Sequence, residues 1–167
     1  MWRAAWVNAV DQYEGRWGEP FRLVQNAGTG LLMHGSEEWN DYRVQADVTP
    51  HMVSAAGLAA RVQGLRRYYA LMLAGVDGGQ NGGTQVQLVK MRDDERILAA
   101  VDFPWEFGRT YILSLALEGN RIRGYIGDAL LFDVTDGDAD ALARGGVALV
   151  ATEGRTATQS VRVAPLD

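Results

Sequence analysis

Planar hydrogen-bonding side chains and aromatic rings recur on one side of several segments in which apolar residues occupy every second position. Amide and guanidinium groups can bind the hydroxyls of a sugar, while an aromatic ring can stack on its apolar C–H face. Because alternate residues of a strand point to opposite sides, such residues would share the polar face of a sheet. We predict that this ligand-binding face contains Arg61, Gln63, Tyr68, Gln87, Arg123 and Tyr125.

A structural interpretation of the same residues stays open. Arg61 and Arg123 could pair with acidic neighbours across the strands, and the tyrosines could fill a curved sheet. Two tryptophans beside the starts of strands pose the same choice, because a tryptophan can close a core or form a binding platform. We expect Trp39 to close the core, whereas Trp105 is kept among the ligand-binding candidates.

Several catalytic chemistries find no support in the sequence. The chain has no cysteine, which excludes a disulfide, a thiolate metal site and a cysteine nucleophile. The two histidines, His34 and His51, do not support a histidine-based zinc site. No nucleophile-elbow motif surrounds a serine. We therefore predict no catalytic residue of these types.

Acidic residues form three short clusters, Glu37-Glu38, Asp93-Asp94-Glu95 and Asp136/Asp138/Asp140. Adjacent carboxylates on a strand face opposite ways, and all three clusters have turn-like surroundings, so we expect solvated turn charges. The segment 136–140 has oxygen ligands at alternate positions, as calcium loops do. It lacks the glycine and the terminal glutamate of the EF-hand pattern, so we assign no calcium ligand there.

Charge and hydrophobic pattern argue against two classes of partner. The net charge of −5 over 167 residues would repel a polyphosphate, so we expect no nucleic-acid partner. No apolar run approaches the length of a membrane-spanning helix, so we expect no membrane partner. The absence of a signal-peptide pattern favours the cytoplasm, although the location stays open.

The segments that position these residues have an apolar period of two, which predicts a mostly β fold. Glycine-containing turns at 64–66, 119–120 and 127–128 separate successive strands, a spacing typical of a sandwich or barrel. About a dozen strands favour two stacked antiparallel sheets in one domain over 1–167, which we expect to be cut from a longer protein. We also expect a glycine-rich hairpin tip at 77–83 and one helical turn within 138–146.

The segments WNDYRVQADVTP, AAGLAARVQGLRRYYALML, VQLVKM, FGRTYILSLALEGNRIRGYIGDALLFDV and GGVALVATEG follow one another along nearly the whole chain. In this order they resemble the concanavalin A-like lectin and glucanase superfamily, in its laminin-G-like jelly-roll form. The resemblance implies a two-sheet antiparallel β-sandwich, a fold that carries many functions. Catalytic glucanases of the superfamily carry a Glu-x-Asp-x-x-Glu run, which this chain lacks. Related sandwiches often hold one structural calcium, so the resemblance allows a calcium ion without assigning its ligands.

The segments EPFRLVQNAGTGLLMHG and DFPWEFGRTY are similar to the C-terminal β-sandwich of some bacterial ADP-ribosylglycohydrolase-family proteins. That similarity implies carbohydrate binding, and the catalytic helical core of those hydrolases is absent here. We therefore expect a non-catalytic carbohydrate-binding module that supports a glycan- or ADP-ribose-directed parent enzyme. The alternatives are a divergent glycoside hydrolase on the same fold and a laminin-G-like protein-interaction domain.

Overall fold

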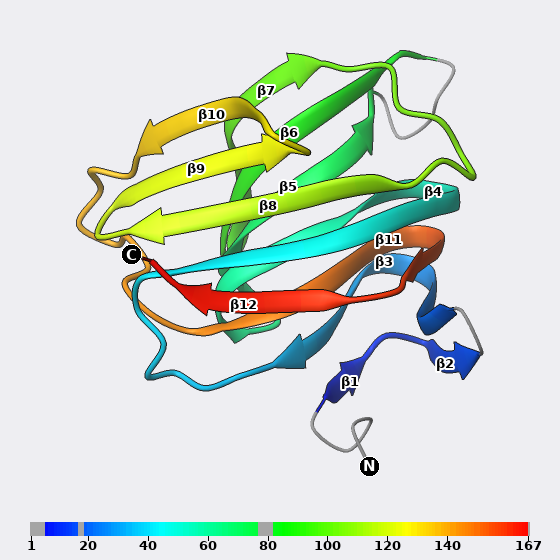
Figure 1. The fold of residues 1–167 in the computed structure, drawn as a ribbon, viewed down its shortest axis with the longest axis horizontal. Helices are drawn as coiled ribbons and strands as arrows, with labels where there is room; N and C mark the ends of the chain where they lie inside the picture. Colours follow the sequence, from blue (N-terminus) through cyan, green and yellow to red (C-terminus); the bar gives the residue numbers. More distant parts are fainter. Residues whose placement is uncertain (1–5, 17–18, 77–81, 167) are drawn as a thin grey trace.

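The computed structural model describes residues 6–16, 19–76 and 82–166, so most of the predicted hairpin tip, residues 77–81, lies outside it. The described residues contain twelve strands and no helix, which confirms the predicted all-β fold (Figure 1). None of their segments is a helix with the length and apolar character that crossing a bilayer requires. The strands are β1 (Val7–Ala9), β2 (Gln12–Arg16), β3 (Glu19–His34), β4 (Tyr42–Gly64), β5 (Arg67–Gly75), β6 (Thr84–Arg92), β7 (Asp94–Asp102), β8 (Tyr111–Glu118), β9 (Arg121–Ile126), β10 (Ala129–Thr135), β11 (Gly146–Thr158) and β12 (Val161–Pro165).

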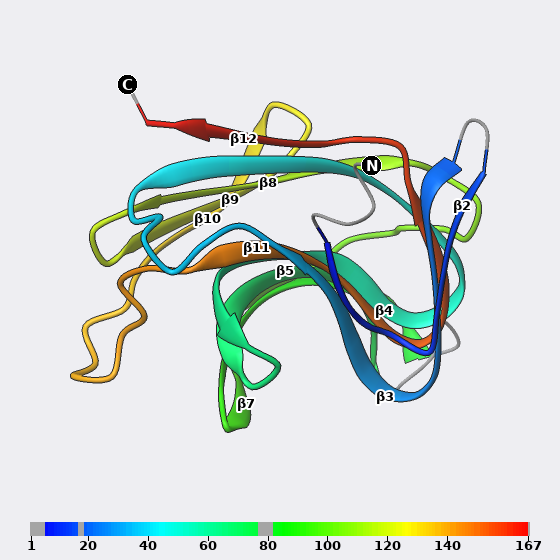
Figure 2. The same ribbon diagram turned by 90° about the horizontal axis from the view of Figure 1, so that it is seen from below.

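The strands form two antiparallel sheets that share one strand. Sheet A has the order β7-β6-β5-β4-β11-β3, and both β1 and β2 pair with β3. Sheet B has the order β12-β4-β8-β9-β10. Strand β4 belongs to both sheets, because residues 42–48 pair with β8 and residues 55–64 pair with β5. Figure 2 shows sheet B stacked on sheet A, the predicted sandwich.

Alternate apolar residues fill the space between the sheets, as the period of two predicts. On β8, Leu113, Leu115 and Leu117 are fully buried, and they meet the buried row of Leu71 and Leu73 on β5. Burial of these side chains is the main force that holds the two layers together.

The predicted tight turns are confirmed. Gly64 pairs with Arg67 across the first turn, and Glu118 pairs with Arg121 across the second. Gly119 has a φ of 55°, a left-handed conformation that glycine adopts without the clash a Cβ causes.

The helical turn predicted within 138–146 is wrong, since this segment is an irregular loop with a turn at its start. An aspartate at 138 or 140 could cap a helix through its side-chain oxygens. The carboxylates of Asp138 and Asp140 instead bind Arg96 and Lys90 on neighbouring strands. These ion pairs hold the loop against sheet A in a non-helical path.

Strands β4 and β11 are irregular side by side, around residues 52 and 153, where their register shifts. Met52 and Glu153 have φ values of 25° and 46°, which are uncommon for residues other than glycine. Gly154 follows with a φ of 146°, and a Cβ there would lie 2.2 Å from the carbonyl oxygen of Met52. Such irregularities bend strands and re-aim side chains. Figure 2 shows that sheet A is curved, with its concave face turned away from sheet B between β7 on one side and the bends of β3 and β4 on the other.

Candidate functional site

The concave face of sheet A holds a groove of about 290 Å³, which we name the concave groove. It crosses strands β3, β4, β5, β6, β7 and β11, so its shape depends on the curvature of the whole sheet. Its lining residues are Thr29, Ser54, Ala55, Tyr68, Ala70, Met72, Ala74, Gly75, Gln87, Val89, Glu95, Ile97, Val150, Thr152 and Glu153.

Small apolar side chains form the floor of the concave groove. Ala70, Val89 and Val150 belong to a second buried apolar cluster on the outer face of sheet A. They alternate with the core residues of the same strands, as Ala70 does with Leu71. Because an alanine leaves more space than the leucine beside it, the outer face is hollow where the inner face is filled.

Tyr68 and Gln87 lie together on the concave groove, as predicted for two members of the polar face. The Tyr68 side chain is buried, and its hydroxyl makes no hydrogen bond to another described residue. The hydroxyl oxygen itself is not fully enclosed by protein atoms. The hydroxyl therefore reaches the solvent in the groove. Burial, and then the nearby Glu95 carboxylate, raise the pKa of Tyr68 to about 12, so the hydroxyl remains a hydrogen-bond donor at neutral pH.

Sequence analysis missed the carboxylates of the concave groove. We expected Glu95 to be a solvated turn charge. It lies near the start of β7 with an exposed side chain, and it lines one side of the groove together with Ile97. Glu153 lies on β11 at the bend and lines the groove beside Thr152. The Glu-Gly pair at 153–154 is a weak signal for such a bend. Nothing local in the sequence indicates that both glutamates line one groove.

Arg61 does not lie on the polar face, so its predicted placement is wrong. Its φ of 49° at an irregular point of β4 turns the side chain into the end of the sandwich, where it is 1% exposed. The guanidinium donates hydrogen bonds to the carbonyl oxygens of Asn40, Gly119 and Leu142 and to Asp41. Arg61 therefore holds loops of both sheets together.

Gln63 and Trp105 also lie away from the concave groove. The Gln63 amide donates to the carbonyl oxygen of Arg144, in a small depression on the β1 side of the sheet. Trp105 is 2% exposed, and its indole nitrogen donates to the carbonyl oxygens of Ala74 and Gln85. Trp105 closes the core, which corrects its inclusion among the exposed candidates.

Arg123 and Tyr125 lie on the outer face of sheet B, the opposite side of the sandwich from Tyr68. The Arg43 guanidinium lies over the Tyr125 ring at 4.8 Å from its centroid. Arg123 lies 3.6 Å from Glu118, on the neighbouring strand. Alternation assigned each residue to an outer face, but it could not tell which sheet that face belongs to.

The three aspartates of the segment 136–140 lie around the ammonium of Lys90, with Asp136 buried and with Asp138 and Asp140 about half exposed. The Lys90 nitrogen lies 2.7 Å from both Asp136 and Asp140, and Asp136 is buried, which corrects the expected solvated charge. Burial opposes the ionised forms, but hydrogen bonds between the partners outweigh it. The pKa of Lys90 is therefore raised and that of Asp136 is lowered.

A calcium ion does not fit at Asp136–Asp140, because the Lys90 ammonium lies between the carboxylates that would bind it. Within the described residues no group of three or more acidic or histidine side chains is arranged for a metal ion. The described residues therefore provide no set of ligands for the structural calcium ion that the resemblance allows.

Comparison with known proteins supports the fold assignment. No protein-family model and no curated protein sequence matches the chain. Among solved structures, the carbohydrate-binding module CBM66 from Bacillus subtilis has a TM-score of 0.80 at 16% identity, over 95% of this chain and 94% of that chain. A Bacillus subtilis protein of unknown function with a galectin-like fold has a TM-score of 0.73 at 13% identity, over 97% and 90%. Galectin LEC-6 of Caenorhabditis elegans has a TM-score of 0.54 at 14% identity, over 86% and 95%.

These likenesses confirm the predicted two-sheet jelly-roll β-sandwich. At such identities they describe the fold alone and carry no residue roles to this chain.

Proposed function

We propose that the protein is a non-catalytic carbohydrate-binding module that holds a sugar in the concave groove. The observation that carries the proposal is the Tyr68 hydroxyl, which faces the groove without a protein hydrogen-bond partner in the described residues, beside Gln87 and Glu95. The names of similar structures agree, since they include a carbohydrate-binding module and a galectin.

The groups of the concave groove suit the two kinds of sugar surface. Carboxylates such as Glu95 and Glu153 accept hydrogen bonds from sugar hydroxyls, while the Tyr68 hydroxyl donates one. The small apolar floor at Ala70 and Val89 lets the C–H face of a sugar ring approach the sheet. These groups come from different strands of one sheet, so the receptor is held in place before the ligand arrives.

We further propose that the module serves a larger glycan-active enzyme, of the ADP-ribosylglycohydrolase type or another class. A tethered binding module raises the effective concentration of substrate at the catalytic domain without taking part in the reaction. The residues of the concave groove would then determine which glycan is retained.

The presence of Glu95 and Glu153 on one groove favours a second candidate, a glycoside hydrolase. Such enzymes need two carboxyl groups on either side of the scissile bond. The two functions differ in a direct measurement. Incubation with the bound oligosaccharide leaves it intact if the protein is a binding module, whereas a hydrolase releases products and loses that activity in Glu95→Gln.

Calorimetric titration with neutral oligosaccharides and with ADP-ribose tests the binding proposal. Ala70→Trp places a large ring on the floor of the groove, and we expect it to abolish binding to the groove. Ile112→Ala is the matched control, because Ile112 is exposed on the outer face of sheet B. Unchanged binding in Ala70→Trp, with both variants folded, would remove the concave groove as the site.

A further inference from the structure

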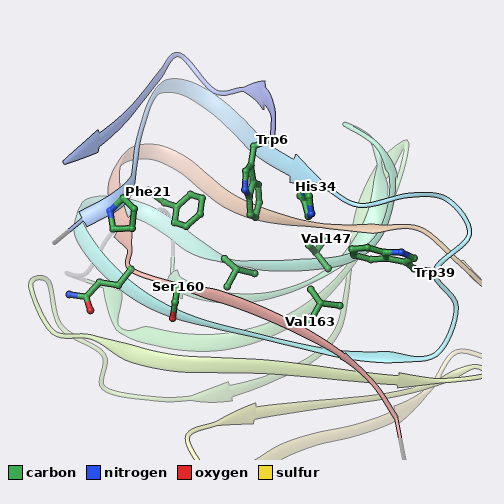
Figure 3. A pocket seen from close by; sticks show the side chains of 10 residues that line it. Trp6, Phe21, His34, Trp39, Val147, Ser160 and Val163 are labelled. Atoms are coloured by element: carbon green, nitrogen blue, oxygen red, sulfur yellow. The ribbon is translucent and has the colours of Figure 1, made fainter. Parts of the chain in front are cut away.

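A second and larger cavity opens between the edges of the two sheets. It has a volume of about 580 Å³, about twice that of the concave groove, and we name it the aromatic cleft (Figure 3). Its walls come from β3 and from Trp6, just before β1, on the sheet A side and from β12 on the sheet B side. On the other side of the sandwich, contacts between β7 and β10 bring the sheet edges together. The volume lies within the range of about 300–1,000 Å³ that is usual for small-ligand sites.

Aromatic rings fixed by one another line the aromatic cleft. Trp6 stacks on His34 at a centroid distance of 5.0 Å and meets the edge of Phe21 at 5.0 Å. Trp39 meets His34 at 6.0 Å in an edge arrangement. Figure 3 shows Trp6 and Trp39 on either side of His34, with Val147 and Val163 facing the same space. Because mutual packing orients these rings, a ligand would not have to order them.

Polar groups of the aromatic cleft lie at the turn between β11 and β12. Gln159 and Ser160 occupy this turn, which is held in place because Asp47 accepts hydrogen bonds from both backbone N–H groups. The Ser160 hydroxyl donates to Asp47, which leaves its lone pairs for a donor on a ligand. Within the described part of the chain, the Gln159 side-chain amide makes no hydrogen bond, so it can both donate to a ligand and accept from it.

No Lys, Arg, Asp or Glu is among the described side chains that line the aromatic cleft. A charged ligand would lose its hydration there without a counter-charge. A ligand that fits has apolar ring faces for the indoles and uncharged hydroxyls for Gln159 and Ser160. Neutral sugars have both, whereas uronic acids and ADP-ribose also carry negative charges for which the described lining offers no Lys or Arg.

We propose that the aromatic cleft is a second saccharide site, specific for neutral sugar rings, in addition to the concave groove. This inference rests on the proposed carbohydrate-binding function and deepens it. The two sites differ in chemistry, since carboxylates line the groove and indole rings line the cleft. A polysaccharide that reaches both sites binds with higher avidity than either site alone provides.

The indole N–H signals of the ¹⁵N-labelled chain separate the two sites in one experiment. The chain has five tryptophans; of these, Trp6 and Trp39 line the cleft, and Trp105 is buried with its N–H bonded to protein carbonyls. In titrations with maltotriose, cellotriose, xylotriose and arabinotriose, we expect at least one sugar to shift the Trp6 and Trp39 signals and leave Trp105 unchanged. ADP-ribose should shift neither. Trp6→Phe and Trp39→Phe assign the signals.

Two further variants test the contacts. Gln159→Ala removes one hydrogen-bonding group and should weaken binding at the cleft about 3- to 10-fold. Val163→Phe fills the cleft and should abolish the indole shifts. Ala70→Trp, which blocks the concave groove, should leave the indole shifts unchanged.

The outcomes distinguish the two proposals. Sugar binding that shifts backbone signals near Tyr68 but no indole signal overturns the second site and leaves the proposed function in place. Indole shifts that persist in Ala70→Trp, without any response near Tyr68, support the cleft and remove the groove. A neutral peptide with valine at alternate positions is the last probe, because it could pair with β12. If this peptide shifts the indole signals and no sugar does, the saccharide assignment is overturned.

Discussion

The ammonium of Lys90 lies 2.7 Å from a carboxylate oxygen of Asp136, and the exposed fractions of the two side chains are 3% and 1%. Lys90 is the only lysine of the chain. An ammonium is more strongly hydrated than the guanidinium of an arginine, yet this one is buried within the sandwich. The Tyr69 hydroxyl donates to the same Asp136 carboxylate at 2.5 Å. The cluster fixes the loop after β10 to strands β5 and β6 of sheet A.

Loss of the Lys90 charge should destabilise the fold. Lys90→Met leaves the buried Asp136 carboxylate without a counter-charge, and we expect the free energy of unfolding to fall by about 3–5 kcal/mol. Urea denaturation followed by tryptophan fluorescence measures the loss. Arg96→Gln is the control, because it removes an exposed ion pair with Asp138, and its effect should be much smaller. Equal effects of the two variants would contradict a structural role for the buried pair.

The Asp136 carboxylate should make the fold sensitive to acid. Burial raises its pKa, but hydrogen bonds from Lys90 and Tyr69 outweigh burial and lower it below the ordinary 3.8. Its stabilising contribution is therefore complete above about pH 4 and is lost as the pH falls through the lowered pKa. We expect the melting temperature of Asp136→Asn to fall less steeply than that of the wild type between about pH 5 and pH 2. Parallel curves would show that Asp136 is not coupled to folding.

Replacement of Arg61 should affect folding before it affects binding. Arg61→Ala leaves the buried carbonyl oxygen of Leu142 without its donor and removes the hydrogen bond to Gly119, and we expect a loss of about 3 kcal/mol. Arg61→Lys should recover a part of it, because one ammonium cannot reproduce the fork of the guanidinium. Thermal unfolding measures both variants. A stable Arg61→Ala protein that has lost sugar binding would return Arg61 to the ligand-binding residues.

The sequence predicts the fold well because the signals for it are local. Alternation on β5 places Tyr69 inside and Tyr68 outside, and glycine at 119 indicates a tight turn. The position of Arg61 depends on a left-handed backbone within a strand, where alternation no longer holds. Nothing in the residues around Arg61 signals that conformation.

The site is less predictable than the fold, since it depends on which strands are neighbours. Tyr68 and Gln87 meet because β5 pairs with β6. Tyr125 has the same outward orientation but belongs to sheet B, so it faces the opposite side of the molecule. Glu95 was missed because only the curvature of sheet A brings its side of β7 into the groove.

The Tyr68 hydroxyl should contribute to binding and not to stability. Since it bonds no other described residue, Tyr68→Phe should leave the melting temperature nearly unchanged and weaken groove binding about 3- to 10-fold. Because the pKa of Tyr68 is raised to about 12, binding should remain constant through pH 10, where an ordinary tyrosine ionises. Calorimetry at several pH values measures both effects. A binding loss centred near pH 10 would exclude Tyr68 as the donor.

Sugar binding should not depend on calcium. The polar groups of the concave groove are a tyrosine, an amide, hydroxyls and carboxylates from several strands. Among the described residues, no group of three or more acidic or histidine side chains is arranged to hold a metal ion. The acidic loop that most resembles a calcium site binds Lys90 instead. We therefore expect the same affinity in excess calcium and in excess chelator. If chelation abolished binding, a metal ion would have to bridge protein and sugar, and the direct contacts from Tyr68 and Glu95 would no longer explain recognition.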